Sequence, residues 1–426
     1  MPHDHSNAPA MVETIADNVF DLIVVGMGSV GLTTALSAAQ GGLRVGVVDP
    51  QSLEQLRGGH FDGRDVAISS ASMRWLSSMG IVEGLASDEH SLIRGARVLD
   101  SATEKNVALK PAPQEEGIGA FVPEYRLRQE TLKILEQQPS VEFFTEEKVA
   151  SLLHLSDRTE LVLESGQHIQ GRVVAAVDGR RSPLRRELGI GVTQHDYAMT
   201  MVCCRVNHTI DQQGWTSQRF VSGGCMAVLP LSAQLSSLAL MMPHAEAERL
   251  STLGDEGFTD WLQHQLGETL GEISLASRRV SVPLSSHYAD HMHRRRAVLL
   301  GDAAVGMLPI TAHGLNLGLI GGRSLVAELL AARGAGEDIG SEAVLKRFSL
   351  RAHATARPLY MATDQICRLF QREDPLSLQA RRMLLQGSGP FGQLIGMNCE
   401  QDDPRQVPWV GVLRDLPRTF LTKWIA

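Results

Sequence analysis

Three short segments contain the residues whose types and spacing could do chemistry. They are Gly26-Met-Gly-Ser-Val-Gly31, then Asp178-Gly179, then a stretch from Gly301-Asp302 to Gly318. Glycines at such spacing let the backbone approach a phosphate, and acids at the ends of strands accept hydrogen bonds from sugar hydroxyls. Together the three segments indicate that the chain binds a dinucleotide.

The elements around the first segment must position it. Residues 20–25 form an apolar, β-branched run that predicts a strand, and residues 32–39 predict a helix whose N-terminal amides would face a pyrophosphate. A second apolar run, residues 44–49, ends in Asp49, which is placed to bind a ribose hydroxyl. A lone glycine motif can be a simple turn, but the flanking strand and the terminal acid favour a dinucleotide site.

The other two segments also follow predicted strands. Residues 172–177 lead into Asp178, and residues 297–301 lead into Asp302. A helix is predicted to begin at Gly314, and its N-terminal amides suit the electron-rich end of a flavin ring, while Asp302 could hold a ribityl chain. The dinucleotide is therefore expected to be FAD.

Two basic positions could complete this site. Arg64 lies in a polar, glycine-rich connection, where it could reach the phosphates or simply be an exposed loop residue. Arg126 and Arg128 lie near the start of a helix predicted over residues 125–135. One of these two is expected to face the cofactor, and Arg128 is the candidate.

Composition narrows the class of protein. The chain has 426 residues, a formal charge of −8 and no basic run longer than Arg294-Arg-Arg296, which disfavours nucleic-acid binding. Five cysteines without a CxxC pair suit a reducing compartment. Residues 1–19 lack the pattern of a signal peptide, and no stretch is judged apolar and long enough to span a bilayer. A cytoplasmic protein is expected, with peripheral membrane association left open.

The spacing of the motifs suggests the domain organisation. A mobile tail is expected over residues 1–19, an FAD-binding domain over 20–190 and 285–340, a strand-rich substrate domain over 191–284, and a helical C-terminal region over 341–426. Part of 86–125 could join the substrate domain. The methionine-rich strands of the substrate domain could be part of an ordinary hydrophobic core, or they could form the wall of a site for an aromatic or lipid-like substrate.

These motifs resemble those of the class A flavoprotein aromatic hydroxylases, and within them the ubiquinone-biosynthesis hydroxylases. The resemblance rests on the three segments above, extended by Asp178-Gly179-x-Arg-Ser182 and by Pro309 before Gly314-Leu-Asn-Leu-Gly318. The subgroup is supported by Asp62-Gly-Arg64, Met226-Ala-Val-Leu-Pro-Leu231 and Thr363-Asp364 followed by Arg368-Leu-Phe370. The resemblance covers residues 19 to about 400.

The resemblance implies an α/β fold: a Rossmann-like FAD-binding domain of the p-hydroxybenzoate hydroxylase type, an inserted mixed-sheet substrate domain and a helical C-terminal region. It further implies reduction of FAD by NAD(P)H and transfer of an OH group from a flavin hydroperoxide to an aromatic ring, with a prenylated ubiquinone precursor as one candidate substrate. No nucleophilic side chain is required, so no catalytic residue is assigned. The candidate cofactor-binding residues are Gly26, Gly28, Ser29, Val30, Gly31, Asp49, Arg64, Arg128, Asp178, Gly301, Asp302, Pro309, His313, Gly314, Leu315 and Asn316.

Some positions depart from the family pattern. Val305 and Leu308 replace two histidines, Gly321 replaces an acid, and Thr311-Ala-His-Gly314 replaces Ala-Gly-Gln-Gly. The departures leave open the substrate and the reductant, and His313 could be a proton carrier or a structural histidine. Two alternatives to the hydroxylase therefore stand: a specialised flavoprotein that oxidises a secondary metabolite or an aromatic side chain of a partner protein, and a non-catalytic flavin-binding member of a complex.

Two further clusters invite a functional interpretation. His287, His291 and His293 could be spaced for a metal, but they lie in a polar stretch, so a solvated loop is expected and no metal site is predicted. Apolar residues around Trp409 and in 420–425 could pack on the core, bind a partner or touch a membrane. Core packing is the simplest expectation for them.

Overall fold

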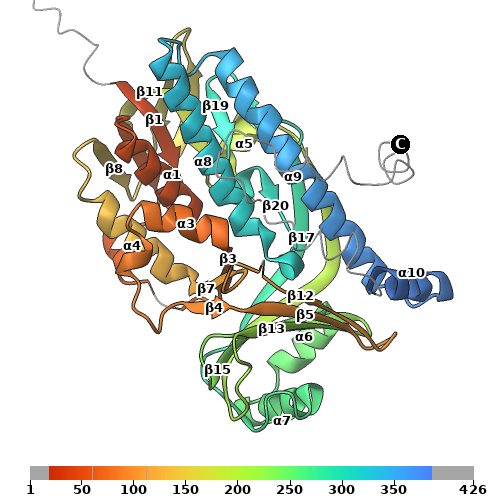
Figure 1. The fold of residues 1–426 in the computed structure, drawn as a ribbon. Coiled ribbons are helices and arrows are strands. Elements are labelled where there is room, and N and C mark those ends of the chain that lie inside the picture. Colours follow the sequence, from red (N-terminus) through yellow and green to blue (C-terminus); the bar gives the residue numbers. More distant parts are fainter. Residues whose placement is uncertain (1–18, 60, 112, 386–426) are drawn as a thin grey trace, which may run out of the picture.

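The computed structural model describes residues 19–385 except 60 and 112 (Figure 1). The predicted tail therefore lies outside the described residues, apart from Val19, which already begins the first strand. The apolar segments around Trp409 and in 420–425 also lie outside them. The described chain forms an α/β structure, as the sequence predicted, and its strands make three sheets.

The first sheet carries the dinucleotide-binding elements. It has eight strands in the order β18-β19-β11-β1-β2-β8, with β10 pairing β11 and β9 pairing β10. β1 pairs parallel with both β2 and β11, so the carboxyl ends of the central strands meet at one edge. The strands are β1 Val19–Val25, β2 Val45–Asp49, β8 Val141–Thr145, β9 Val149–His154, β10 Thr159–Leu163, β11 His168–Ala176, β18 His293–Arg294 and β19 Ala297–Leu299.

Helices pack around this sheet and bury its apolar strands. β2 is buried along its whole length, which explains its continuous Val-rich sequence. α1 packs against both α4 and α8, and α8 packs against α9 (Figure 1). The helical elements of this part are α1 Ser29–Gln40, α2 Leu53–Arg57, α3 Ser70–Ser78, η2 Val82–Gly84, α4 Glu124–Leu135, α5 Pro183–Glu187, η3 Gly301–Ala303, η4 Pro309–Thr311, α8 His313–Gly334, α9 Glu342–Phe370 and α10 Pro375–Leu385.

The second sheet forms a separate layer (Figure 1). It has nine strands in the order β20-β17-β12-β15-β14-β13-β5-β6, with β16 pairing β12, and α6 His244–Ser251 and α7 Asp255–Leu266 cover part of it. Residues 95–109 contribute β5 and β6 to this sheet although they lie far from its other strands in sequence. The strands are β5 Gly95–Asp100, β6 Lys105–Leu109, β12 Val192–His208, β13 Trp215–Val221, β14 Gly224–Pro230, β15 Leu235–Pro243, β16 Ile273–Leu275, β17 Val280–Ala289 and β20 Val305–Gly306.

The methionine-rich strands serve both purposes that the sequence left open. Met226 and Met242 are buried in a core with α6 and α7, whereas Met201 lines a cavity on the other face of the same sheet. Successive strand residues point to opposite faces, so one strand can supply both a core and a cavity wall. A third sheet, β3 Asp65–Ser69, β7 Gly119–Pro123 and β4 Ser91–Ile93, lies between the two larger ones (Figure 1).

The sequence predicted no segment long and apolar enough to cross a membrane, and α8 corrects that expectation. By length and composition it meets that criterion, with a mean hydropathy of 1.3 over its apolar window. However, 61% of that window is buried inside the protein, where α8 contacts α1 and α9. Its apolar character is accounted for by its place in the core.

A buried ion pair joins the third sheet to the second sheet. Both carboxylate oxygens of Asp65 accept hydrogen bonds from Arg205, from Nε at 2.9 Å and from a terminal nitrogen at 2.5 Å. The Asp65 side chain is 0% exposed, and Arg205 also lies 4.0 Å from the Phe61 ring centroid. The pair therefore fixes the start of β3 against β12.

Replacing Arg205 by Met should destabilise the protein by about 3 kcal/mol, because it leaves the Asp65 carboxylate buried without a partner. The measurement is urea unfolding of the variant against the wild type. Arg205→Met combined with Asp65→Asn is the control and should recover part of the loss. A single variant as stable as the wild type would contradict this account of the pair.

Candidate functional site

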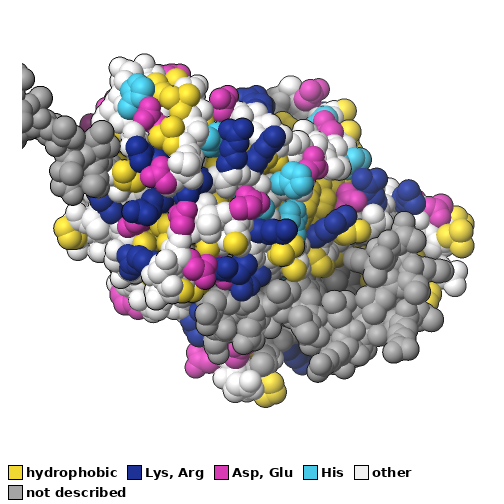
Figure 2. Space-filling model, turned by 90° about the horizontal axis from the view of Figure 1, so that it is seen from above, with side chains coloured by type: hydrophobic (Ala, Val, Ile, Leu, Met, Phe, Trp, Pro, Cys, Tyr) yellow, Lys and Arg dark blue, Asp and Glu magenta, His cyan; other side chains and the backbone are white. Residues whose placement is uncertain are grey.

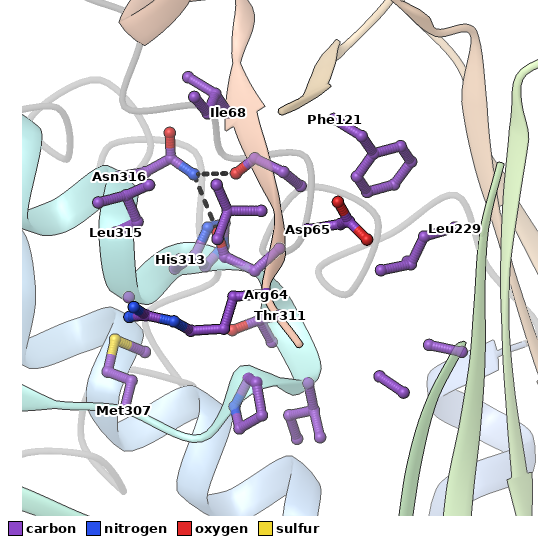
Figure 3. Close-up of a pocket in the computed structure, with 18 of the residues that line it drawn as sticks. Arg64, Asp65, Ile68, Phe121, Leu229, Met307, Thr311, His313, Leu315 and Asn316 are labelled. Atoms are coloured by element: carbon purple, nitrogen blue, oxygen red, sulfur yellow. Dashed lines mark hydrogen bonds between the residues drawn. The ribbon is translucent and has the colours of Figure 1, made fainter. Parts of the chain in front are cut away.

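A cavity of about 1100 Å³ lies between the first and second sheets, with β3 and β7 along its side. Eleven of the sixteen predicted cofactor residues line it. They are Gly28, Ser29, Val30, Arg64, Gly301, Asp302, Pro309, His313, Gly314, Leu315 and Asn316. Gly26, Gly31, Asp49, Arg128 and Asp178 do not line it. The structure thus brings together residues that the sequence separates by almost three hundred positions (Figure 3).

The glycine segment has the geometry of a phosphate-binding turn. Gly26 has φ +115°, and a Cβ there would lie 2.4 Å from the carbonyl oxygen of Val177. A Cβ on Gly31 would lie 1.9 Å from the Gly26 carbonyl oxygen, whereas one on Gly28 would meet nothing within 4 Å. Gly26 and Gly31 are therefore required by packing, and Gly28 leaves open space at the N-terminus of α1 for a phosphate.

Asp49 lies beside this turn, at the end of β2. Its carboxylate accepts hydrogen bonds from the backbone N–H of Met27 at 2.5 Å and of Gln51 at 2.8 Å, and the residue is only 7% exposed. The side chain therefore stabilises the glycine turn. Its binding of a ribose hydroxyl stays a prediction.

A buried carboxylate that the sequence reasoning missed organises the basic residues. Glu124, 5% exposed at the start of α4, accepts a hydrogen bond from Ser29 Oγ at 2.6 Å and from Arg64 at 2.9 Å. Arg128 Nε lies 3.0 Å from the same carboxylate. Arg128 thus contacts Glu124, which lines the cavity, although Arg128 itself does not. Arg126 instead pairs with Glu89 and Glu130. The position of Glu124 at a helix start gave no signal in the sequence that distinguishes it from an ordinary first-turn acid.

Asp178 lies at the end of β11, and its side chain turns toward α5. Its carboxylate accepts a hydrogen bond from the Leu184 N–H at 3.0 Å, and burial raises its pKa. This contact caps a short helix. A direct role of Asp178 in binding the cofactor stays a prediction.

Arg180 is a second residue that the sequence reasoning did not single out. Its Nε donates to Asp302 at 3.0 Å, and its other nitrogens donate to the carbonyls of Ser285 at 2.6 Å and Met307 at 2.9 Å. Asp302 keeps 43% of its side chain exposed, and both residues line the cavity. Arg180 therefore fixes the Asp302 carboxylate at the cavity wall, where it can accept hydroxyl hydrogen bonds. The only hint in sequence was its neighbourhood to Asp178-Gly179.

The N-terminus of α8 forms the opposite wall. Ala312 has φ +55°, and a Cβ on Gly314 would meet nothing within 4 Å. Asn316 connects α8 to β3, because its amide donates to the Ala67 carbonyl at 2.9 Å and its oxygen accepts from the Ser69 N–H at 2.9 Å (Figure 3). Leu315 lines the same wall. The helix N-terminus is thus held open toward the cavity, and its free amides can face an anion or a flavin carbonyl.

His313 carries an unpaired group at this wall. Among the described residues its buried Nε2 has no hydrogen-bond partner, and burial lowers its pKa to about 4. The sequence left open whether His313 is a proton carrier or a structural histidine, and the lowered pKa favours a neutral imidazole. A neutral imidazole with a free nitrogen instead provides a hydrogen-bonding position for a bound ligand.

Protonation of His313 should destabilise the cofactor-free fold. Its pKa is lower in the folded than in the unfolded chain, so between about pH 6.5 and pH 4 the unfolded chain binds more protons and stability falls as pH falls. The contribution is on the order of 3 kcal/mol. Denaturant unfolding at several pH values should show a flatter pH dependence for His313→Asn than for the wild type. Equal slopes for the two proteins would contradict the assignment.

The histidine cluster is also partly corrected. His287 is 4% exposed and lies in β17, where its Nε2 is 2.8 Å from the Asp302 carbonyl, so it is not in a solvated loop. No group of metal-ligating residues occurs among the described residues.

On the face shown in Figure 2, basic and acidic side chains are intermixed.

Comparisons with known proteins agree with this geometry. The model of the FAD binding domain family matches residues 20–363. The ubiquinone hydroxylase UbiM of Neisseria meningitidis is 30% identical over 379 residues, 88% of this chain and 82% of the relative. The ubiquinone hydroxylase UbiL of Rhodospirillum rubrum is 30% identical over 394 residues, 92% of each chain.

The chain belongs to the class A FAD-dependent aromatic monooxygenases. Solved structures agree on the fold. PqsL of Pseudomonas aeruginosa, in a mutant form, has a TM-score of 0.72 at 20% identity, covering 88% of this chain and 99% of the other. The p-nitrophenol 4-monooxygenase PnpA of Pseudomonas putida has a TM-score of 0.70 at 19% identity, covering 88% and 95%.

The walls of this monooxygenase fit FAD. Gly28 and Gly314 leave space where side chains would intrude, and the His313 nitrogen is free to bond a ligand. Ser29 and Arg64, which both donate to Glu124, line the end where a pyrophosphate would lie, and Asp302 brings an acceptor for ribityl hydroxyls. Bound FAD supplies electron transfer and oxygen chemistry. The residues that line the cavity would hold and orient it.

Proposed function

We propose that this monooxygenase hydroxylates an electron-rich aromatic ring that carries an apolar substituent, with a prenylated ubiquinone precursor as the leading candidate. NAD(P)H is the proposed reductant, and the overall balance is NAD(P)H + H⁺ + O₂ + Ar–H giving NAD(P)⁺ + Ar–OH + H₂O. The proposed route passes through a flavin hydroperoxide, as the family resemblance implies.

One observation carries the proposal: a single cavity is polar and cofactor-like at one end and apolar at the other. Residues of β5, β6, β12–β15 and β17 line the second part mainly with Val, Leu, Ala, Met and Phe, and only a few polar side chains such as Thr216 and Gln218 are among them. Such a lining binds an apolar ligand and keeps water from the reacting atoms. The names of the similar proteins support the substrate class: UbiM and UbiL are ubiquinone hydroxylases, and the Escherichia coli protein, 28% identical over 343 residues, is a 3-demethoxyubiquinol 3-hydroxylase.

The test is product analysis with the FAD-loaded enzyme, NADH or NADPH, isotopically labelled dioxygen and 2-prenylphenol. The proposal expects a product one oxygen atom heavier than the phenol, with the label in that atom. Consumption of NAD(P)H that yields only hydrogen peroxide with every phenol tried would contradict it. Binding to a membrane or to a protein complex is a separate proposal, checked by flotation with vesicles.

A further inference from the structure

One side of the apolar part of the cavity, next to the N-terminus of α8, is formed by residues of a single small core. Its wall consists of Met201, Phe220, Leu284, Leu308, Ile310 and Ile366. All six belong to or pack against one small core that also contains Phe370 and Leu385. This wall, called the end wall below, therefore combines the second sheet, the loop before α8 and the C-terminal helices.

The end wall lies beside the cofactor end of the cavity. Leu308 and Ile310 directly precede the N-terminus of α8, and Thr311 lies 3.1 Å from Thr363 of α9 through their hydroxyl oxygens. Ile366 comes three residues after Thr363, so both lie on the same face of α9. Ile366 therefore lines the cavity close to the N-terminus of α8.

The segment 363–370 of α9, which the sequence singled out without a role, is fixed against the second sheet. Asp364 accepts a hydrogen bond from Tyr197 OH at 2.5 Å and from Arg368 Nε at 2.8 Å. The ring of Phe370 stacks on that of Phe220, with centroids 3.9 Å apart and planes at 26°. Phe220 is therefore held in place as part of the end wall by a residue that does not itself line the cavity.

α10 secures this arrangement from outside. Arg381 is 3% exposed and donates to the carbonyls of Leu369 at 3.1 Å and Phe370 at 2.5 Å at the end of α9. It also lies 3.5 Å from Asp100 of β5. Arg381 thus links the end of α9 to β5 of the second sheet, next to the residues of the end wall.

We infer that the end wall sets the size of the apolar substituent that the substrate can carry, with Ile366 as the residue in contact with it and Phe370 as a positioning residue. This inference rests on the proposed function. A shape-matched apolar wall discriminates ligands by their methylene groups, and one methylene can change selectivity by about 10-fold or more. Segment 363–370 would then be a specificity element of the enzyme.

The experiment compares 2-methylphenol, 2-prenylphenol and 2-geranylphenol with the FAD-loaded enzyme. Dissociation constants are measured from the change in flavin absorption on binding, and turnover is measured in parallel. Ile366→Ala should shift the preference toward 2-geranylphenol by about 10-fold, and Ile366→Phe should shift it toward 2-methylphenol by a similar factor. Met361→Ala, on an exposed part of the same helix, is the matched control and should leave the preference unchanged.

Phe370 provides an independent arm of the test. Phe370→Leu should shift the preference in the same direction as Ile366→Ala, with FAD affinity unchanged. Phe370→Tyr, which keeps the ring, should retain the wild-type preference. If every Ile366 and Phe370 variant changes all three dissociation constants by the same factor while the wild type still hydroxylates a phenol, the inference is overturned alone. If the wild type binds none of the three phenols, the proposed function fails, and the inference with it.

Discussion

Gly28→Val should abolish retention of FAD while leaving the fold intact. A Cβ at Gly28 meets nothing within 4 Å in the protein, and it would project into the cavity at the N-terminus of α1. The added side chain would occupy the space that a pyrophosphate needs to reach the helix amides. We expect FAD affinity to fall by about 100-fold or more, equivalent to roughly 3 kcal/mol of binding energy. The measurement is titration of the cofactor-free protein with FAD by fluorescence.

The control for this variant is Gly31→Val. A Cβ at Gly31 would lie 1.9 Å from the Gly26 carbonyl oxygen, so that variant should misfold and not merely lose FAD. Circular dichroism and thermal unfolding separate the two outcomes. A Gly28→Val protein that folds and binds FAD as tightly as the wild type would contradict the position assigned to the pyrophosphate.

Asp302→Asn should weaken FAD binding by about 10-fold or more, because hydrogen bonds to a charged acceptor contribute more than those to an amide. Asp302 faces the cavity and is oriented by Arg180, so the substitution changes charge while preserving shape. FAD titration measures the effect. Stability should change little, since 43% of the Asp302 side chain is exposed.

Asp338→Asn is the matched control for Asp302→Asn. Asp338 also pairs with an arginine, Arg296, but neither residue lines the cavity. It should bind FAD with wild-type affinity. If the two asparagine variants behave alike, the Asp302 side chain is not part of the cofactor site.

Much of the fold could be predicted because local patterns and tertiary structure agree. The helix predicted from 125–135 is α4 Glu124–Leu135, and the run 44–49 contains β2, whose unbroken apolar sequence reflects burial on both faces. The packing need for glycine at position 31 is also local, because a Cβ there would meet the Gly26 carbonyl oxygen of the same turn, whereas the need at Gly26 comes from Val177 at the end of a distant strand. Local chemistry was sufficient except at Gly26.

Features that depend on distant partners could not be predicted. The role of Glu124 depends on Ser29, which is 95 positions away, and that of Arg180 depends on carbonyls more than 100 positions away. For His313 the sequence left a proton carrier and a structural histidine open, because the burial that lowers its pKa to about 4 depends on residues distant in sequence. His287 was placed in a loop because its neighbours are polar, although it lies buried in β17.

The most direct test of the central claim is anaerobic mixing of the FAD-loaded enzyme with NADPH or NADH, with and without 2-prenylphenol, while the absorption of oxidised flavin is followed. We expect that a nicotinamide reduces the flavin and that the phenol accelerates the reduction. A flavin that stays oxidised with both nicotinamides in the presence of the phenol would contradict the proposed NAD(P)H-dependent hydroxylase. The result would then favour a flavoprotein that takes its electrons from another donor.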